Sequence, residues 1–393
     1  MKYFLIFLGI ILFQHSYAQE AKYSAFYKER AELMFQKVWQ HYRVPQHSGL
    51  FSEHYPTGGR VNLDYFQGAG VKEKEVSFLW PFSGVFSAAN VLIKYPDLQA
   101  KYKKYLDTLS IGVLAYRDTT RIPVGYQAYP ATLEKSDRYY DDNGLVCIDY
   151  VEAYFNTKDA TYITKAKEVF NFIISGWDDK LGGGVYWLEG HKDQKPACSN
   201  GMATLAALKL YQATKEPFYL TWGTRFYNWM HSTLRNPDGI YYNDVKMDGK
   251  PNETYYTYNT GSMLEAAVLM YHFTADQKYL KEAQLVASNS FGFFSEEHHG
   301  VRQFKIDLPW FVTVLFRGYE ALYKVDRNPR YINAVAANLD RAWQESADRY
   351  GFLTAKWATD DASKRKPKWL LDEACIAELY GRMSLLNIKS KQE

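Results

Sequence analysis

The feature that most constrains this chain is a pair of tyrosines, eight residues apart, that recurs around a short polar break. It appears as "YFNTKDATY" from Tyr154, "YQATKEPFY" from Tyr211, "YHFTADQKY" from Tyr271 and "YKVDRNPRY" from Tyr323, with a looser copy, "YPDLQAKY", from Tyr95. Successive copies begin 59, 57, 60 and 52 residues apart. Self-similarity at such a period indicates a repeat architecture. The predicted unit is a helix, a tight turn and a second helix.

The two helices of each unit differ in sequence. The segment before each break is rich in small and apolar residues almost all round, as in "NGLVCIDYVEAY" and "SNGMATLAALKLY", which predicts a helix buried on most sides. The segment after the break carries Lys, Glu and Arg on one face, as in "YITKAKEVFNFII". We therefore expect an inner layer of buried helices and an outer layer of amphipathic helices.

Two further helices remain at the ends of the chain. The segment "YSAFYKERAELMFQKVWQHY" is amphipathic like an outer helix, and "DEACIAELYGRMSLL" looks like an inner one. Paired with each other, they complete a sixth unit and close a ring. The predicted fold is therefore all-α, an (α/α)6 barrel of six inner and six outer helices. An open helical solenoid is the alternative, but it leaves the matched terminal helices unexplained.

The first residues have the layout of a cleavable secretory signal. The stretch "MKYFLIFLGIILFQHSYAQE" combines an early lysine, an apolar run shorter than the roughly 20 residues that span a bilayer, and small residues before Gln19. We assign residues 1–18 to a signal peptide and residues 19–393 to a single barrel domain, exported to the periplasm or the medium. No second long apolar run follows, so we expect no membrane span.

Charge and cysteine content exclude several classes of protein. The formal net charge is +3 with acids and bases mixed along the chain, which gives no basis for nucleic-acid binding. Three scattered cysteines, Cys147, Cys198 and Cys375, make no disulfide framework and are expected to be buried free thiols. The 34 tyrosines and 10 tryptophans partly fill the core, and in an exported protein they also suit carbohydrate, whose C–H faces stack on aromatic rings.

The connections between helices are unequal in length. Turns from an inner to an outer helix are tight, whereas connections from an outer to the next inner helix are long. Long loops in a compact domain are usually functional. They must all emerge at one end of the barrel, beside the N-termini of the inner helices, and that end is the predicted active face. The long connections are residues 44–75, 117–137, 178–197, 235–257, 295–306 and 347–370.

The stretch "RYYDDNGLV" places Asp141 and Asp142 at the start of an inner helix on that face. Aspartate at a helix N-terminus also serves as a cap, and the chain has two other Asp-Asp pairs, at 178–179 and 360–361. Only the first pair lies at an inner-helix start, which favours a catalytic role. Adjacent carboxyl groups reach the roughly 5 Å separation of retaining glycosidases, and their repulsion raises one of the two pKa values. The sequence leaves open which aspartate is ionised.

Other side chains at the same rim suit a sugar. Asparagine both donates and accepts hydrogen bonds, and aromatic rings offer stacking platforms, although capping and helix packing account for the same residue types. The candidate substrate-binding residues are Tyr139, Tyr140, Trp187, Asn200, Tyr258, Asn259 and Trp310. Further aromatic platforms are Trp80, Tyr186, Tyr255, Tyr256 and Trp357, and "LDEA" adds two polar residues, Asp372 and Glu373.

No motif for a metal or an organic cofactor is found. His298 and His299 stand beside Glu296 and Glu297, but adjacent ligands lack the spacing of a metal site. No phosphate-cradling glycine loop and no G-x-S-x-G elbow is present. We therefore expect neither a metal nor a cofactor.

These motifs resemble those of glycoside hydrolase family 76, the α-1,6-mannanase family, over most of the mature chain. The stretch "YYDDNGLVCIDYVEAY" resembles its Asp-Asp motif. The stretches "GGGVYW", "KPACSNG" and "TYNTGSMLEAAVLMY" are similar, in the same order, to its Gly-Gly-Gly-aromatic loop, its Asn-Ala-x-Ser-Asn-Gly segment and its Thr-Tyr-Asn-x-Gly helix start. The stretch "DGIYYNDV" resembles a further loop whose aspartate, here Asp244, approaches the site.

The resemblance implies an (α/α)6 fold and retaining hydrolysis of α-1,6-mannan or a related α-mannoside without a cofactor. It makes Asp141 the nucleophile and Asp142 the acid/base. The chain departs from the family pattern where "IDLPW" at 306–310 replaces a glycine-containing stretch, and where Pro196 stands in place of the usual asparagine. Both departures lie at the rim and bear on linkage, chain length and endo or exo action. We expect an endo-acting, monomeric enzyme.

Two other functions remain open from the sequence. A sugar epimerase uses the same barrel but needs bases, often histidines, in the cavity. His272 lies within an inner helix and His231 within an outer one, both away from the rim, which argues against this function. A non-catalytic glycan-binding relative has no need of two aspartates. The expected partner in every case is a polysaccharide or an oligosaccharide.

Overall fold

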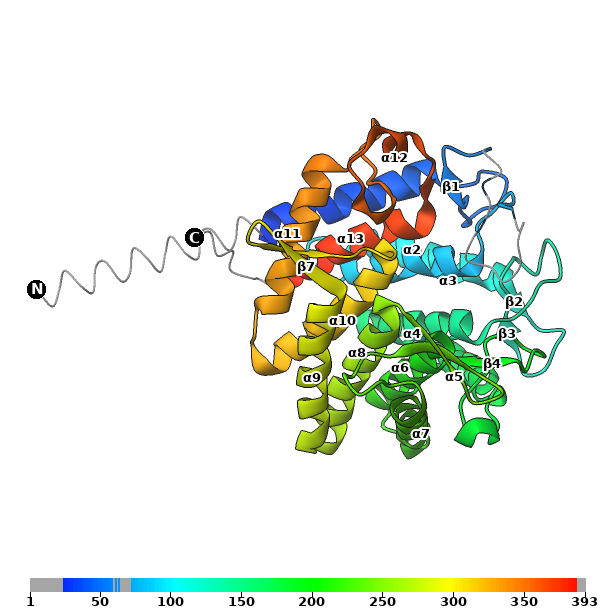
Figure 1. Cartoon of the computed structure of the whole chain (residues 1–393). Helices are drawn as coiled ribbons and strands as arrows, with labels where there is room; N and C mark the ends of the chain where they lie inside the picture. Colours follow the sequence, from blue (N-terminus) through cyan, green and yellow to red (C-terminus); the bar gives the residue numbers. More distant parts are fainter. Residues whose placement is uncertain (1–23, 59–60, 62, 64–71, 387–393) are drawn as a thin grey trace, which may run out of the picture.

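The computed structural model describes residues 24–58, 61, 63 and 72–386, so the proposed signal peptide lies outside the described residues. Within them, inner and outer helices alternate along the chain (Figure 1). The inner helices are α2 (Leu79–Leu92), α4 (Tyr140–Thr157), α6 (Ala197–Thr214), α8 (Thr257–Thr274), α10 (Pro309–Asp326) and α13 (Leu370–Leu385). The outer helices are residues 24–41, α3 (Gln99–Gly112), α5 (Ala160–Ser175), α7 (Pro217–Thr233), α9 (Gln277–Phe294) and α11 (Arg330–Glu345).

The predicted (α/α)6 barrel is confirmed, including its closure by the two terminal helices. Each inner helix packs against the next, and α13 packs between α10 and α2. The N-terminal helix lies against α13, where Ser24 Oγ donates to the carbonyl of Ser384 at 2.9 Å and Ser384 Oγ donates back to the carbonyl of Ser24 at 2.7 Å. In Figure 1 these two helices, blue and red, lie together although they are the first and last of the barrel. The open solenoid is therefore excluded.

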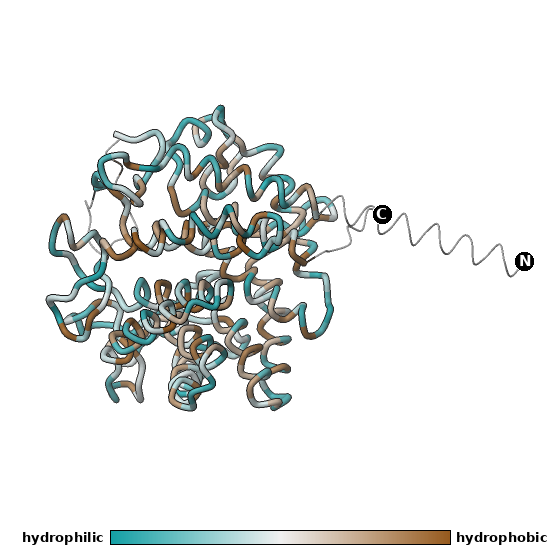
Figure 2. Tube along the Cα trace, turned by 180° about the vertical axis from the view of Figure 1, so that it is seen from behind, coloured by the Kyte–Doolittle hydropathy of each residue, from teal (hydrophilic) through white to brown (hydrophobic). Residues whose placement is uncertain are grey.

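Burial follows the pattern expected for two layers. The inner helix α6 has nearly all its residues buried, whereas the outer helix α11 buries one face. Figure 2 shows hydrophobic residues concentrated in the central helices and hydrophilic ones along the outer turns. None of the described helices is long and apolar enough to cross a bilayer.

The repeated tyrosines mark the turn from an inner to an outer helix. The carbonyl of the first tyrosine accepts a hydrogen bond from the N–H of a residue four positions on, which takes the left-handed conformation and ends the helix. The second tyrosine begins the outer helix and is buried against the core. The four left-handed residues, with φ between 57° and 62°, are Lys158, Lys215, Ala275 and Arg327. The eight-residue spacing is therefore the geometry of this turn.

The long connections contain short antiparallel strands that the sequence did not predict. Strands of two to five residues are too short to show a period of alternating hydrophobicity. The strand pairs are β1 (His54–Tyr55) with β9 (Lys368–Trp369), β2 (Arg117–Asp118) with β3 (Gly125–Tyr126), and β7 (Ser295–His298) with β8 (Val301–Phe304). A three-stranded sheet joins β4 (Gln194–Pro196), β5 (Tyr242–Lys246) and β6 (Pro251–Tyr255). The remaining short helices are the 3-10 turns Val113–Tyr116, Lys180–Gly182 and Ala355–Trp357, and α12 (Asp361–Arg365).

The fourth residue of four inner helices fastens these connections to the barrel. In each case its side-chain oxygen accepts a hydrogen bond from a backbone N–H of the preceding connection, which satisfies a buried donor. The pairs are Asn143 with Tyr126 N (2.7 Å), Asn200 with Val185 N (2.8 Å), Thr260 with Tyr241 N (3.2 Å) and Glu373 with Leu353 N (3.2 Å). The inner helices therefore share one register, and the residues just before each tether lie at the same end of the barrel.

Candidate active site

A cavity of about 910 Å³ lies at the N-terminal ends of the inner helices, the end that the long connections predict. All six inner helices contribute to its lining. The second residue of five of them lines the cavity, and these residues are Trp80, Asp141, Cys198, Tyr258 and Trp310. Asp142 follows Asp141 into the same space. The cavity thus combines two adjacent carboxyl groups with aromatic walls, which is the chemistry of a sugar site.

The two aspartates have different surroundings. Asp141 Oδ2 accepts a hydrogen bond from the indole Nε1 of Trp187 at 3.1 Å. Burial raises the pKa of Asp141, while the thiol of Cys198, the indole of Trp187 and the backbone N–H groups of the helix start lower it. Burial and the charge of Asp141 together hold the pKa of Asp142 well above its usual range. These surroundings favour the charge on Asp141 and the proton on Asp142.

The position of Trp187 is fixed by a short ladder beside the start of α4. Tyr139 and Leu188 form an antiparallel bridge. On either side of it, Tyr140 N donates to the carbonyl of Trp187 at 3.0 Å and Glu189 N donates to the carbonyl of Arg138 at 3.0 Å. The indole that stabilises the charge on Asp141 is therefore held by the backbone of the same helix start.

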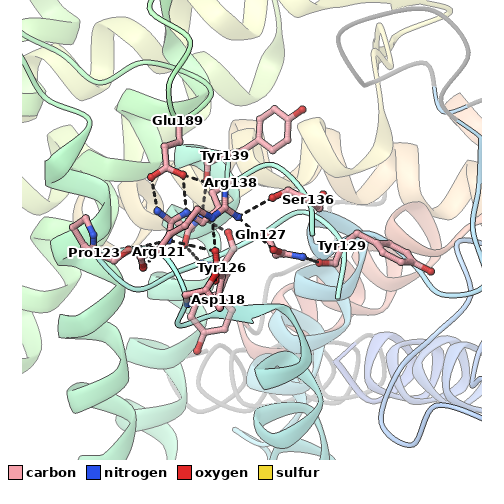
Figure 3. Close-up of polar contacts among 12 residues, drawn as sticks. Asp118, Arg121, Pro123, Tyr126, Gln127, Tyr129, Ser136, Arg138, Tyr139 and Glu189 are labelled. Carbon is pink, nitrogen blue, oxygen red and sulfur yellow. Dashed lines mark hydrogen bonds and ion pairs between the residues drawn. The ribbon is translucent and has the colours of Figure 1, made fainter. Parts of the chain in front are cut away.

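The buried guanidinium of Arg138 bonds to both connections beside this ladder, residues 117–137 and 178–197 (Figure 3). The side chain of Arg138 is fully buried and forms a bidentate pair with Glu189, with its Nε 2.8 Å from Oε2. Its Nη1 donates to the carbonyl of Pro123 at 2.9 Å and lies 3.8 Å from Asp118. A planar guanidinium suits such a multiply bonded position. Residues 117–137 and 178–197 are thereby held around the aspartate pair.

The structure brings most of the predicted site residues together. Those that line the cavity, besides the two aspartates, are Tyr139, Trp187, Asp244, Tyr258 and Trp310, with Trp80 and Tyr256 among the further aromatic platforms. The platforms that do not line it are Tyr186, Tyr255 and Trp357. Tyr186 instead donates to Asp178 at 2.7 Å, and Trp357 is buried.

The structure places three of the predicted substrate-binding residues outside the cavity lining. The ring of Tyr140 stacks on Phe172 of the outer layer, with centroids 4.8 Å apart. Asn200 is the tether to Val185 described above. Asn259 is fully buried and faces Asn243, with Nδ2 and Oδ1 3.4 Å apart. Helix packing accounts for Tyr140 and the tether for Asn200, whereas Asn259 lies directly behind Asn243, which lines the cavity.

Asp244 lies on the three-stranded sheet at one wall of the cavity. Its Oδ2 accepts hydrogen bonds from Asn252 at 2.7 Å and from Asn243 at 3.0 Å, and its Oδ1 lies 3.2 Å from the ammonium of Lys246. Lys246 also donates to Gln194 of the neighbouring strand β4. The pairing of β5 with β4 and β6 brings Gln194 and Asn252 to this group, so the sequence predicted Asp244 but not these two distant partners.

The "IDLPW" stretch supplies both a cap and an aromatic wall. Asp307 accepts hydrogen bonds from Thr257 N at 2.8 Å and Thr257 Oγ1 at 2.9 Å, which satisfies the start of α8. Pro309 then begins α10, a position that proline favours. Trp310 follows it into the cavity. Residues 306–310 therefore form the rim between α8 and α10.

The other two Asp-Asp pairs have structural partners. Asp178 pairs with the buried ammonium of Lys195 at 2.7 Å, and Asp360 caps α12 through Ser363 N at 2.8 Å. Among the residues that the structure describes, no three His, Cys, Asp or Glu side chains gather as a metal site. The three cysteines are buried free thiols, as predicted, although Cys198 also lines the cavity.

Comparison with known proteins agrees with this geometry. The model of the family described as glycosyl hydrolase family 76 matches residues 26–384. A family 76 glycoside hydrolase of Bacteroides thetaiotaomicron, described as a mannosidase, is 26% identical with a TM-score of 0.82, and the match covers 92% of this chain and 98% of the other. A second, from a bovine strain of the same species, is 25% identical with a TM-score of 0.81, covering 92% and 78%.

Curated relatives match over a shorter segment. The mannan endo-1,6-α-mannosidase DCW1 of Saccharomyces cerevisiae is 29% identical over 147 residues, which is 35% of this chain and 32% of the relative. The protein of the same name from Candida albicans is 30% identical over 157 residues, 35% of each chain. The chain thus spans about a third of the length of these curated relatives. With the family model matched along almost the whole barrel, the chain belongs to glycosyl hydrolase family 76.

Proposed function

We propose that this protein hydrolyses α-1,6-linked mannan, or a related α-mannoside, with retention of configuration. The observation that carries the proposal is the unequal environment of the aspartate pair: the indole N–H of Trp187 donates to Asp141, which favours its carboxylate, while burial and the charge of Asp141 raise the pKa of Asp142, which favours its protonated form. These are the two protonation states that double displacement requires. The mannosidase names of the relatives support the choice of glycan.

In the proposed first step, the carboxylate of Asp141 attacks the anomeric carbon while Asp142 gives its proton to the departing glycosidic oxygen. The anomeric C–O bond breaks and a glycosyl ester forms on Asp141. Once that charge is gone, the pKa of Asp142 falls, because the repulsion that raised it has been removed. Asp142 then takes a proton from a water molecule, which attacks the anomeric carbon and releases Asp141 as a carboxylate.

Export is a separate part of the proposal. The charged residue, apolar run and small residues of the first 18 positions support cleavage after translocation. A mannan-degrading enzyme meets its polymer outside the cytoplasm, so we place the mature protein in the periplasm or the medium. Mass spectrometry of the mature N-terminus recovered from cells tests this assignment, and an intact Met1 would contradict it.

The decisive experiment is incubation with unbranched α-1,6-mannan, followed by sizing of the products and early NMR of the anomeric signal. Endo action yields intermediate oligosaccharides first, and retention yields the α-anomer first. If free mannose is the only product, the enzyme is exo-acting rather than endo-acting. If the β-anomer forms first, the enzyme inverts the configuration rather than retaining it. Unchanged polymer length with an altered sugar would indicate an epimerase, and binding without any product a non-catalytic relative.

Replacing Trp187 with phenylalanine should move the acid limb of the kcat/KM profile to higher pH by about 0.5–1 unit. The indole N–H stabilises the charged form of Asp141, so its removal raises the pKa of that carboxyl. Activity at low pH requires ionised Asp141. As pH falls, the Trp187→Phe variant should therefore lose activity at a higher pH than the wild type. The matched control is Trp222→Phe on the outer helix α7, for which both limbs should stay in place. An acid limb that does not move would contradict the role of this hydrogen bond.

A further inference from the structure

Asp372 occupies a position in α13 that corresponds to that of Asp142 in α4. Each is the third residue of its inner helix, and each immediately precedes the residue that tethers a connection, Glu373 in α13 and Asn143 in α4. Asp372 also lines the 910 Å³ cavity. The barrel repeat therefore places a third carboxyl group at the same end as the aspartate pair, with α2 between α13 and α4 in the ring.

The two neighbouring acids of α13 differ in what holds them. Glu373 Oε2 accepts a hydrogen bond from Leu353 N, so its carboxylate has a structural partner. Asp372 is 5% exposed, and among the described residues its Oδ1 has no hydrogen-bond partner. Burial raises the pKa of Asp372 to about 7. A buried acceptor without a partner is costly to the fold, and a ligand that binds in the cavity can supply the missing donor to Asp372.

The surroundings of Asp372 suit a sugar ring. Three tryptophans line the cavity near Asp372. Trp80 and Trp310 belong to α2 and α10, the helices on either side of α13, and Trp369 immediately precedes α13. The ring of Trp80 lies 5.3 Å from those of both Trp310 and Trp369, with edge-to-face geometry. Indoles offer an apolar surface to C–H groups, and a carboxyl group accepts from hydroxyls. This part of the wall has both components.

We propose that Asp372 binds a hydroxyl of a mannosyl unit in the part of the cavity walled by these three tryptophans. The inference rests on the proposed function and adds to it a substrate-contacting residue outside the aspartate pair. The hydroxyl donates to Oδ1, and the sugar ring packs on indole. Asp372 takes no part in bond cleavage, and it determines how tightly a chain of several units is held.

Binding of α-1,6-mannotetraose by calorimetry tests the proposal in the Asp142→Asn background, which keeps the ligand intact. At a pH above 7, where Asp372 is ionised, we expect the additional change Asp372→Ala to weaken binding about 10- to 100-fold, the effect of losing a hydrogen bond to a charged group. The additional change Asp372→Asn keeps one acceptor oxygen and should weaken binding less. The matched control is Asp149→Asn, a buried acid of the inner helix α4 that does not line the cavity, and it should leave affinity within about twofold.

Thermal unfolding of the same variants separates binding from structure. Removing an acceptor that has no partner should leave the melting temperature unchanged or raise it, because the fold loses an unpaired buried polar group. Equal affinities with and without Asp372 would overturn the inference alone. A fall in both affinity and melting temperature for Asp372→Ala and Asp372→Asn would overturn it in favour of a structural role. No tetraose binding by the Asp142→Asn protein would overturn the proposed function, and the inference with it.

Discussion

We expect Asp141→Asn and Asp142→Asn each to lower the turnover of α-1,6-mannan on the order of 10⁴-fold, while the fold stays intact. Asparagine at 141 cannot form the glycosyl ester, and asparagine at 142 cannot donate a proton. Asp141→Asn removes a buried charge, and Asp142→Asn replaces a protonated carboxyl group with a neutral amide, so the melting temperature should hold or rise. Turnover by reducing-end assay and thermal unfolding check the two halves of this expectation.

An activated substrate separates the two roles. An aryl α-mannoside with an acidic phenol as leaving group needs little protonation, so Asp142→Asn should recover glycosylation of the enzyme and show a burst of phenol. Asp141→Asn should show none, because the nucleophile is missing. The matched control is Asp360→Asn at the exposed cap of α12, which should retain full activity. A burst from the Asp141 variant instead would reverse the assignment.

Glu378→Gln should lower the free energy of unfolding by about 3–5 kcal/mol, the usual cost of breaking a buried ion pair. Glu378 is fully buried, and its carboxylate accepts from Arg317 Nε at 2.7 Å and from Arg382 Nε at 2.7 Å. Ser87 Oγ also donates to it at 2.9 Å. These contacts join α2, α10 and α13 where the ring closes, and the glutamine variant leaves two buried guanidinium groups undercompensated. Urea denaturation at pH 7 measures the loss.

The same experiment has a definite pH dependence. The two arginines lower the pKa of Glu378 to about 2, against roughly 4.3 in an unfolded chain. The contribution of Glu378 to the free energy of unfolding is therefore complete above about pH 4.3 and is lost as pH falls toward about 2. The difference between wild type and Glu378→Gln should shrink over that window. Glu216→Gln, at an exposed pair with Lys167, is the control and should change stability by less than about 0.5 kcal/mol. A Glu378→Gln loss no larger than that control would contradict the role of the network.

The helical layers could be predicted from sequence because their signals are long. Segments of 14 to 18 residues show whether a helix is apolar all round, as α6 is, or on one face, as α11 is. The short strands gave no such signal, since β1 and β9 have two residues each and come from distant parts of the chain. Their contribution to the rim, including Trp369, was therefore missed.

Site residues could be predicted where the position of a residue in the inner helix determines whether its side chain points into the cavity. Asp141, Tyr258 and Trp310 are second residues of inner helices and line the cavity. Asn200, the fourth residue of α6, is instead bonded to the preceding connection, and Asn259, the third residue of α8, is buried beside Asn243. A shift of one or two positions exceeds what sequence alone resolves at a helix start. Cys198 was treated as an ordinary buried thiol for the same reason.

The joining of the first and last helices has a consequence for biosynthesis. Ser24 and Ser384 bond to each other across 360 positions of sequence. The N-terminal helix is made before its partner, so the side on which Tyr27 packs against Tyr380 has no native cover until nearly the whole barrel has been synthesised. Closing so large a loop costs chain entropy before any contact compensates for it. We expect the barrel to remain open until α13 has been synthesised. Until then, we expect the nascent chain to need protection from aggregation.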